Sequence, residues 1–154
     1  MELKHYQPEL YNEVAQIEVS DGDRKFTRTP LHNIELAQKD AERYPILVYD
    51  HGQCIGFFTL HVGRGVSVYT RNSHAIFFRS FSIDKRYRGK GLGKKVLRLL
   101  PQFIYQNFPR INEIYLTVND DNEVAQKLYY QLKYERVGNV TVEGRPNYLM
   151  RKEI

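Results

Sequence analysis

The spacing of apolar residues along the chain predicts seven strands and four helices. Side chains alternate between the two faces of a strand but repeat every 3.6 residues around a helix, so the sequence distinguishes the two. Stretches rich in β-branched and aromatic residues predict strands at 2–6, 45–50, 54–62, 74–83, 114–118, 134–142 and 147–152. Helical spacing is found at 8–18, 29–43, 92–104 and 122–132. The order β-α-α-β-β-β-α-β-α-β-β predicts an α/β fold in one domain, residues 1–154.

Proline and polar residues predict where the helices begin and end. Pro8 fits the first turn of a helix, where its missing N–H costs nothing, and the sequence Ser-Asp-Gly-Asp at 20–23 ends that helix. Thr29 is predicted to cap the second helix, with Pro30 at its first position. Pro101 lies inside the third helical stretch and has no N–H to donate, which predicts a kink or an early end there.

Glycine-containing turns separate the strands. A tight turn is predicted at 51–52, and the segment 63–72, with two glycines, is predicted to be a loop or an irregular hairpin tip. The sequence Glu-Gly-Arg-Pro at 143–146 is predicted to be the turn of a final hairpin.

The composition excludes several classes of protein. No apolar run approaches the length of a transmembrane helix, and residues 1–4 start no apolar signal segment, so we expect no membrane partner. Cys54 is the one cysteine, which excludes an intrachain disulfide and favours the reducing cytoplasm; we interpret it as a packing residue. The five histidines form no HExxH pair, so no metal site is predicted.

The charge is distributed unevenly along the chain. The net charge is +5, yet residues 85–112 hold eight basic residues and no acidic one, whereas residues 1–62 hold ten acidic residues against six basic ones. A local positive field of this kind suits a phosphorylated ligand. A nucleic-acid-binding protein more often spreads basic residues along a face with exposed aromatic residues, so we expect no nucleic-acid partner.

The basic stretch contains a glycine-rich loop, residues 82–95, between a predicted strand and a predicted helix. The N-terminus of a helix presents unpaired N–H groups and the positive end of the helix dipole. Gly89, Gly91 and Gly93 allow positive φ and let the backbone approach a ligand closely. These features favour a phosphate, and above all a diphosphate, as the ligand.

Two familiar phosphate loops are excluded. A P-loop would need glycine in place of Arg88 and Ser or Thr in place of Lys95, and a dinucleotide fingerprint would need glycine in place of Lys94. The pattern Arg88-x-x-Gly91-x-Gly93 instead resembles the diphosphate-binding signature of the GNAT family of N-acetyltransferases. The same pattern also occurs two residues earlier, from Arg86, and the later frame is preferred because the helix starts directly after it. A solvated basic turn is the alternative interpretation.

A second segment resembles the same family. The strand 114–118 is followed by an N-cap cluster, Asn119-Asp-Asp-Asn122, and by the pattern Asn122-x-x-Ala-x-x-Leu-Tyr129 on one helix face. Taken alone, Tyr129 would be one more core-facing aromatic residue; the two motifs in this order favour the family. The family usually has glycine where Lys133 stands, so the end of this helix departs from the pattern.

The resemblance implies a GNAT fold, an α/β (α+β) architecture with a mixed central sheet of about seven strands and about four flanking helices. It implies acetyl-CoA as the cosubstrate of a direct acetyl transfer to an amine. The backbone of Phe81, Ser82 and Ile83 would pair with the pantetheine arm, and one of their N–H groups would polarise the thioester carbonyl. The residues implied to hold the diphosphate are Arg86, Arg88, Gly89, Lys90, Gly91, Leu92, Gly93 and Lys94.

The second motif is implied to serve the sulfur end of the cofactor. Tyr129 takes the family's general-acid position, and we interpret it as a hydrogen-bond donor to the sulfur, because a phenol is a weaker acid than a thiol. Asn119 and Asn122 would contact the cofactor, with helix capping as the alternative, which is the stronger one for Asn122. Arg86 is interpreted equally well as a surface charge.

The acidic first third of the chain bears on the acceptor, because the first two helices border the acceptor site in this family. Glu18, Asp21, Asp23 and Glu35 could attract a small cationic amine such as a polyamine or diamine; solvated helix faces are the alternative. A protein lysine or N-terminal amine is the alternative acceptor, and a non-catalytic acyl-CoA-binding module the alternative function. The sequence does not decide between a monomer and a homodimer. No general base is identified, the conceivable ones being Glu35, Asp84, Glu113 and His74.

Overall fold

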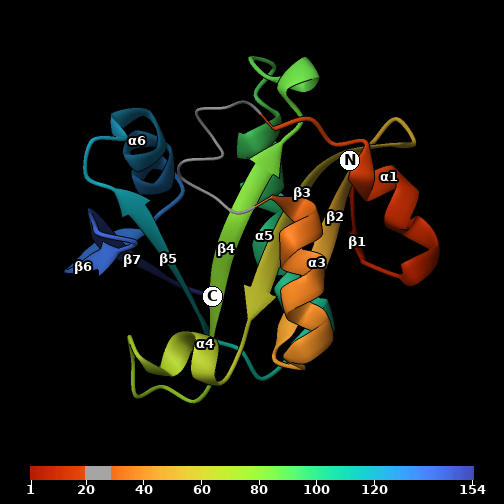
Figure 1. Cartoon of the computed structure of the whole chain (residues 1–154). Coiled ribbons are helices and arrows are strands. Elements are labelled where there is room, and N and C mark those ends of the chain that lie inside the picture. Colours follow the sequence, from red (N-terminus) through yellow and green to blue (C-terminus); the bar gives the residue numbers. More distant parts are fainter. Residues whose placement is uncertain (20–28) are drawn as a thin grey trace.

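The computed structural model describes residues 1–19 and 29–154, and its strands form one sheet (Figure 1). The strands are β1 (Glu2–His5), β2 (Arg43–Asp50), β3 (Gln53–His61), β4 (Ala75–Ile83), β5 (Glu113–Asn119), β6 (Glu135–Val142) and β7 (Arg145–Glu153). The α-helices of the described residues are α1 (Tyr11–Ala15), α3 (Pro30–Lys39), α4 (Arg64–Ser67), α5 (Leu92–Asn107) and α6 (Glu123–Gln131). Two 3₁₀ turns, η1 (Pro8–Leu10) and η2 (Lys85–Tyr87), precede α1 and α5. The predicted fold class, a mixed seven-stranded sheet with flanking helices, is confirmed.

The sheet divides between its two central strands. Its order is β1-β2-β3-β4-β5-β7-β6, and all neighbours are antiparallel except β4 and β5, which run parallel. That parallel pairing covers only Ala75–Phe77 of β4 and Glu113–Tyr115 of β5, although both strands continue beyond it. The two strands therefore separate toward their C-terminal ends (Figure 1).

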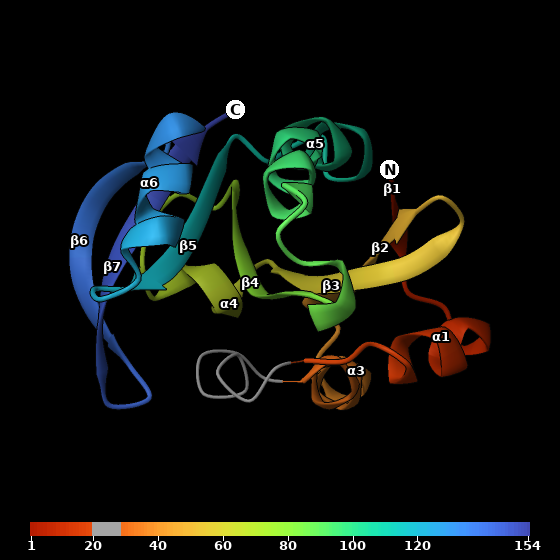
Figure 2. The same cartoon turned by 90° about the horizontal axis from the view of Figure 1, so that it is seen from above.

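Helices cover both faces of the sheet (Figure 2). α5 and α6 lie on one face, over an apolar cluster that includes Phe58, Phe78 and Leu100. α1 and α3 lie on the other face, where Val14 and Ile34 belong to a second cluster with residues of β2 and β3. Removing these apolar side chains from water is the main force that holds the layers together.

The register between β3 and β4 shifts by one residue in the middle of β4. Ser80 and Phe81 together stand opposite Phe58, which is a β-bulge, and Ser80 has a φ of 59°. A bulge bends its strand, and this one lies in the stretch where β4 has left β5. The bulge therefore coincides with the opening in the sheet.

The first helix is shorter than predicted, because tertiary contacts override its periodicity. The structure has the turn η1 and then α1, which ends at Ala15 rather than continuing to Glu18. The Glu18 N–H donates to the Asp84 carboxylate over 3.1 Å, and the Glu18 carbonyl accepts from the Lys85 N–H over 2.8 Å. These bonds hold Glu18 in an extended link. The predicted helix end at 20–23 lies outside the described residues.

The second helix begins as predicted and ends early. The Thr29 hydroxyl accepts from the His32 N–H over 3.3 Å, which confirms Thr29 as the N-cap, with Pro30 as the first helical residue. The helix stops at Lys39, not at Arg43, because Arg43 already pairs with β3 as the first residue of β2. Competition from the sheet sets this boundary.

Of the two effects predicted for Pro101, a kink or an early end of the helix, the early end is wrong. α5 continues from Leu92 to Asn107 with Pro101 in its interior. Proline cannot donate to the carbonyl of Leu97, but Leu100 and Ile104 on either side of it are fully buried against the sheet. This packing maintains the helix despite the missing hydrogen bond.

Two turns differ in detail from their predictions. The segment 63–72 contains the short helix α4 as well as loop. The final hairpin turns over Glu143 and Gly144 alone, with φ values of 50° and 78°, so that Arg145 and the residue after it already belong to β7. A two-residue turn with both φ values positive matches the twist of the flanking strands, which explains why the predicted four-residue turn is shorter.

Candidate functional site

A cavity of about 510 Å³ lies where β4 and β5 separate. Its walls come from β4, β5, α5, α6 and the end of the β6–β7 hairpin. The residues that line it include Tyr69, Phe77, Arg79, Phe81, Asn119, Asn122, Tyr129, Glu143 and Arg145. Four of the predicted site residues, Phe81, Asn119, Asn122 and Tyr129, therefore share one cavity, although 48 positions separate the first from the last in sequence.

The predicted pantetheine-binding stretch forms the end of β4. On its β3 side this stretch is paired, Ser82 with Phe57 and Ile83 with Gly56, whereas its pairing toward β5 ends at Phe77. One edge of the backbone here is thus unpaired by the sheet, as an extended ligand that adds like a strand would need. The Ser82 side chain is buried, and its hydroxyl has no hydrogen-bond partner among the described residues.

The glycine loop leads into an α5 N-terminus that no side chain caps. Gly89 and Gly91 have φ values of 76° and 73°, and a Cβ on either would touch nothing within 4 Å. Glycine is therefore required here by backbone conformation. Gly93 differs: it is the second helical residue and lacks the predicted positive φ, and a Cβ there would lie 3.8 Å from the Phe81 ring.

Two arginines of the loop donate hydrogen bonds to other groups of the protein. Arg86 donates to both oxygens of the buried Asp84 carboxylate, over 3.0 and 2.7 Å, and to the Gln16 carbonyl over 3.0 Å. Arg88 donates through Nε and Nη2 to the Ile83 carbonyl, over 3.2 Å each. The side chain of Arg86 is therefore turned toward the α1 segment, where it pairs with the buried Asp84 carboxylate.

The remaining predicted residues of the loop are Leu92, Lys90 and Lys94, which present main-chain groups or positively charged side chains at the start of α5. Leu92 is buried in the core, so only its main chain faces the loop. Lys90 lies with its ammonium 5.6 Å from the centre of the Tyr87 ring, and Lys94 is half-buried in the first turn of α5. Their positive charges reinforce the dipole of α5 at this point.

Both predicted asparagines have partners within the protein. The Asn122 side chain accepts from the Ala125 N–H over 3.2 Å, so it caps α6, as its alternative interpretation stated. The Asn119 side-chain oxygen accepts from Asn147 over 3.2 Å. Each still lines the cavity, so capping and ligand contact do not exclude one another.

Tyr129 lies on α6 with its ring beside that of Tyr134, at 5.6 Å between centres. Burial raises the pKa of the Tyr129 phenol to about 12. The hydroxyl therefore stays protonated at neutral pH and can donate a hydrogen bond to a group in the cavity. Such a donor suits a leaving atom that gains negative charge.

The model of the acetyltransferase (GNAT) family matches residues 8–134. The chain belongs to the GNAT family of acetyltransferases. The match spans α1 to the end of α6, so it includes the glycine loop, the unpaired end of β4 and Tyr129.

Relatives and solved structures agree with this GNAT membership. An uncharacterized N-acetyltransferase of Bacillus subtilis, YbbJ, is 34% identical over 128 residues, which is 82% of this chain and 80% of the relative. The spermine/spermidine N(1)-acetyltransferase of B. subtilis is 26% identical over 131 residues, 85% of either chain. The structure of aminoglycoside acetyltransferase AAC(6')-Ib with coenzyme A and kanamycin is similar in fold, with a TM-score of 0.65, 22% identity, and coverage of 77% of this chain and 70% of that one.

The structure brings residues to this GNAT site that the motifs did not identify. Tyr69, Phe77 and Arg79 line the cavity on one side, and Glu143 and Arg145 of the last hairpin on the other. One signal was present in the sequence, since Arg79 is a lone charge in the apolar strand 74–83. The hairpin residues carried no such signal, because their place depends on how β6 and β7 pair across β5.

The conceivable general bases lie in unlike surroundings. Asp84 is fully buried, and although burial by itself raises a carboxyl pKa, its bonds to Arg86 and the Glu18 N–H lower the pKa below the usual range. Glu113 accepts from Asn72, and Glu35 is exposed on α3, 3.8 Å from His32. The fourth, His74, is exposed, and Asp21 and Asp23 of the predicted acceptor side lie outside the described residues.

Three further sequence predictions concern chemistry outside the cavity. Burial raises the pKa of the Cys54 thiol to about 11, so the thiol is protonated and unreactive at neutral pH. Within residues 1–19 and 29–154, no group of His, Cys, Asp and Glu is arranged to hold a metal ion. Among the helices in residues 1–19 and 29–154, none combines the length and the apolar character that a membrane-spanning helix needs.

Proposed function

We propose that this GNAT acetyltransferase transfers the acetyl group of acetyl-CoA directly to a primary amine of a small molecule. The observation that carries the proposal is the cavity between β4 and β5, with the uncapped N-terminus of α5 beside it and Tyr129 in its wall. Diamines and polyamines are the first acceptors to test, because the 26% identical relative is a spermine/spermidine acetyltransferase. The single cysteine, Cys54, favours action in the reducing cytoplasm.

The residues present fit acetyl-CoA. Backbone N–H groups from Arg88 to Lys94 would surround the diphosphate. The α5 N-terminus has no side-chain cap, so its N–H groups can donate to a ligand, and Gly89 and Gly91 provide the positive φ values of the loop. The unpaired edge of β4 from Phe81 to Ile83 binds the amides of the pantetheine arm in strand fashion. Acetyl-CoA supplies the activated acetyl group.

The protein's own groups stabilise charge at the two ends of the thioester. A β4 N–H within Phe81–Ile83 polarises the carbonyl, as an oxyanion hole does. Tyr129 donates a hydrogen bond to the sulfur as it leaves with the electron pair of the C–S bond. The acceptor amine must be neutral to attack, so its proton passes to a base or to water before or during the transfer.

Two measurements test this proposal. Calorimetric titration of CoA into the folded protein should show binding, and thiol release from acetyl-CoA should depend on an added amine. The amines are spermidine, spermine, putrescine, cadaverine, L-lysine, L-ornithine and a lysine-containing peptide. Absence of CoA binding would remove the proposal.

The alternatives give different patterns in the same assay. Thiol release with the peptide but with no free amine would favour a protein lysine or N-terminal amine as acceptor. Binding of CoA with no thiol release for any amine would favour a non-catalytic acyl-CoA-binding module. Gel filtration of the folded protein would determine whether it is a homodimer.

A further inference from the structure

A buried carboxylate stands where β4 leads into the glycine loop. Asp84 directly follows the last residue of β4, and its side chain is fully buried. Its oxygens accept hydrogen bonds from the Arg86 N–H over 2.9 Å, from Arg86 Nε over 3.0 Å, from Arg86 Nη2 over 2.7 Å and from the Glu18 N–H over 3.1 Å. A buried carboxylate is unfavourable unless it is paired and hydrogen-bonded in this way. These bonds therefore determine the path of the chain as it leaves β4.

Arg86 also bonds the start of the loop to the segment that follows α1. Its Nη2 donates to the Gln16 carbonyl over 3.0 Å, 70 positions earlier in the sequence, and the neighbouring Lys85 N–H donates to the Glu18 carbonyl over 2.8 Å. Figure 1 shows this segment passing the C-terminal end of β4, where the loop begins. A guanidinium can serve several acceptors at once because its donors lie in a fixed planar arrangement, whereas the ammonium of lysine is a point charge.

The charges of this pair do not by themselves favour an anionic ligand. The bonds to Asp84 use Nε and Nη2 of Arg86, the edge with which an arginine binds a carboxylate or a phosphate in bidentate fashion. That edge is not free for a diphosphate while the pair is intact. The Asp84 carboxylate adds a negative charge beside the loop, which repels a diphosphate. Any contribution of the pair to CoA binding must therefore come from the conformation that it gives the loop.

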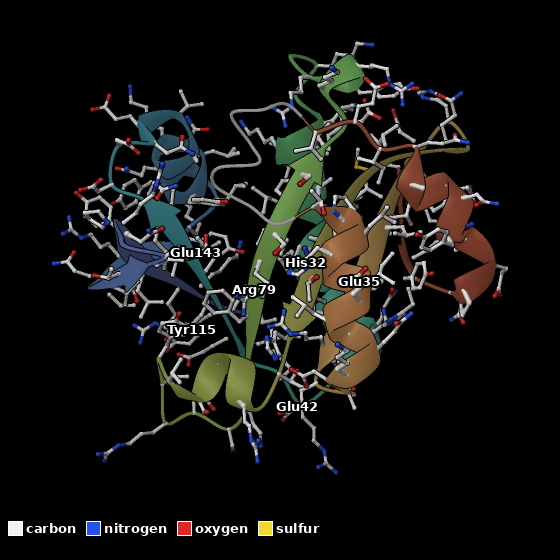
Figure 3. The ribbon with its side chains drawn as sticks, in the orientation of Figure 1. His32, Glu35, Glu42, Arg79, Tyr115 and Glu143 are labelled. Atoms are coloured by element: carbon white, nitrogen blue, oxygen red, sulfur yellow. The ribbon has the colours of Figure 1, made fainter. Side chains whose placement is uncertain are left out.

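We infer that Asp84 and Arg86 are positioning residues for the diphosphate loop: they hold its N–H groups in place for CoA, and Arg86 does not itself contact the diphosphate. The inference rests on the proposed function, because this loop is the proposed CoA site. A loop that is fixed before the ligand arrives binds more tightly, since less conformational freedom is lost on binding. Figure 3 shows Arg79 beside the middle of β4, whereas the loop begins at the C-terminal end of the strand, so we expect the pair to affect CoA and not the amine.

The test is the Kd of CoA, measured by calorimetry for the wild-type protein, Asp84→Asn, Arg86→Lys and the double variant. Charge alone predicts tighter binding for Asp84→Asn and no change for Arg86→Lys. We expect each single variant to bind CoA about tenfold more weakly, and the double variant to lie within about twofold of either, because the two residues act as one pair. Lys85→Gln is the matched control: it removes a positive charge that lies 3.6 Å from the exposed Glu18 carboxylate, and it should leave the Kd within about twofold.

Thiol-release kinetics distinguish positioning of the loop from a general loss of structure. In both single variants the KM for acetyl-CoA should rise about tenfold, whereas kcat and the KM for the amine should stay close to the wild-type values. Urea unfolding shows whether each variant is folded. The Arg86 side chain is 53% exposed, so Arg86→Lys decides the inference if Asp84→Asn does not fold.

The outcomes separate this inference from the proposed function. Tighter or unchanged CoA binding in Asp84→Asn would overturn the inference and leave the acetyltransferase proposal intact. Unchanged affinity in Arg86→Lys would do the same, as would losses that multiply in the double variant. If CoA binds but no amine releases thiol, the proposed transfer fails and the Kd values alone decide the inference. If the wild-type protein binds no CoA, both are overturned.

Discussion

Replacing Tyr129 by phenylalanine tests the proposed chemistry most directly. The substitution removes one hydroxyl and keeps the ring that packs beside Tyr134. We expect turnover to fall by roughly 10- to 1000-fold, the range measured for a single general acid or oxyanion contact. The affinity for CoA should change little, because we propose that the diphosphate binds at the glycine loop and not at Tyr129.

The pKa of the Tyr129 phenol sets the form of this contribution. Moving a proton from a phenol with a pKa of about 12 to a thiolate with a pKa of about 8.5 costs roughly 5 kcal/mol. Complete transfer in the ground state is therefore unfavourable, and a hydrogen bond to the developing thiolate accounts for the effect. The rate should accordingly show no inflection from Tyr129 as the pH rises toward 11.

The assay is single-turnover release of CoA thiol with a saturating amine, combined with calorimetric titration of CoA. Tyr130→Phe is the matched control, because Tyr130 is the next residue of α6 and is 48% exposed. Its turnover should equal that of the wild-type protein. Unchanged turnover in Tyr129→Phe, or an equal fall in both variants, would refute the role given to Tyr129.

Three further predictions concern stability and reactivity. Lys133 has a φ of 72° at the end of α6, so Lys133→Gly should raise the free energy of unfolding by about 1 kcal/mol in urea; a decrease would contradict this. Asp84→Asn should lower it by about 2 kcal/mol at pH 7. Because the native pKa of Asp84 is lowered, this difference should persist above pH 5 and shrink as the pH falls below about 4; a difference independent of pH would contradict it. Cys54 should react with iodoacetamide only slowly at pH 7.5, and rapid labelling would contradict its raised pKa.

The local part of the fold could be predicted from sequence, and the boundaries set by tertiary contacts could not. The cap at Thr29 depends on residues within one helical turn, and it was predicted correctly. The end of α1 depends on bonds between Glu18 and Asp84, 66 positions apart. At Pro101 the local rule predicted a kink or an early helix end, and the helix does not end there, because burial of the neighbouring side chains against the sheet outweighs the lost hydrogen bond. Lys133 is a third case, where the backbone takes positive φ although the sequence lacks glycine there.

In the candidate site, too, the locally determined parts could be predicted from sequence and the parts that depend on strand pairing could not. The glycine loop and the α6 cap are short motifs whose conformation is local, so the sequence located them. The contact from Arg79 to His61, and from His61 to Asp40, follows from strand register and from the place of the β3–β4 connection. The register between two strands could not be predicted from this one sequence. The sequence showed only that Arg79 is a lone charge in an apolar strand, and the structure identifies its partner as His61.

The bulge at Ser80 lets one strand place neighbouring side chains on both faces of the sheet. In a regular strand, residues two positions apart point to the same face. The extra residue in β4 separates Arg79, which lies over Phe77, from Phe81, which packs beside Phe78 on the face of α5. The positive φ of Ser80 is the local strain that accompanies this arrangement. With a regular register, Arg79 and Phe81 would share a face, and the cavity could receive a side chain of β4 from only one face of the sheet at this point.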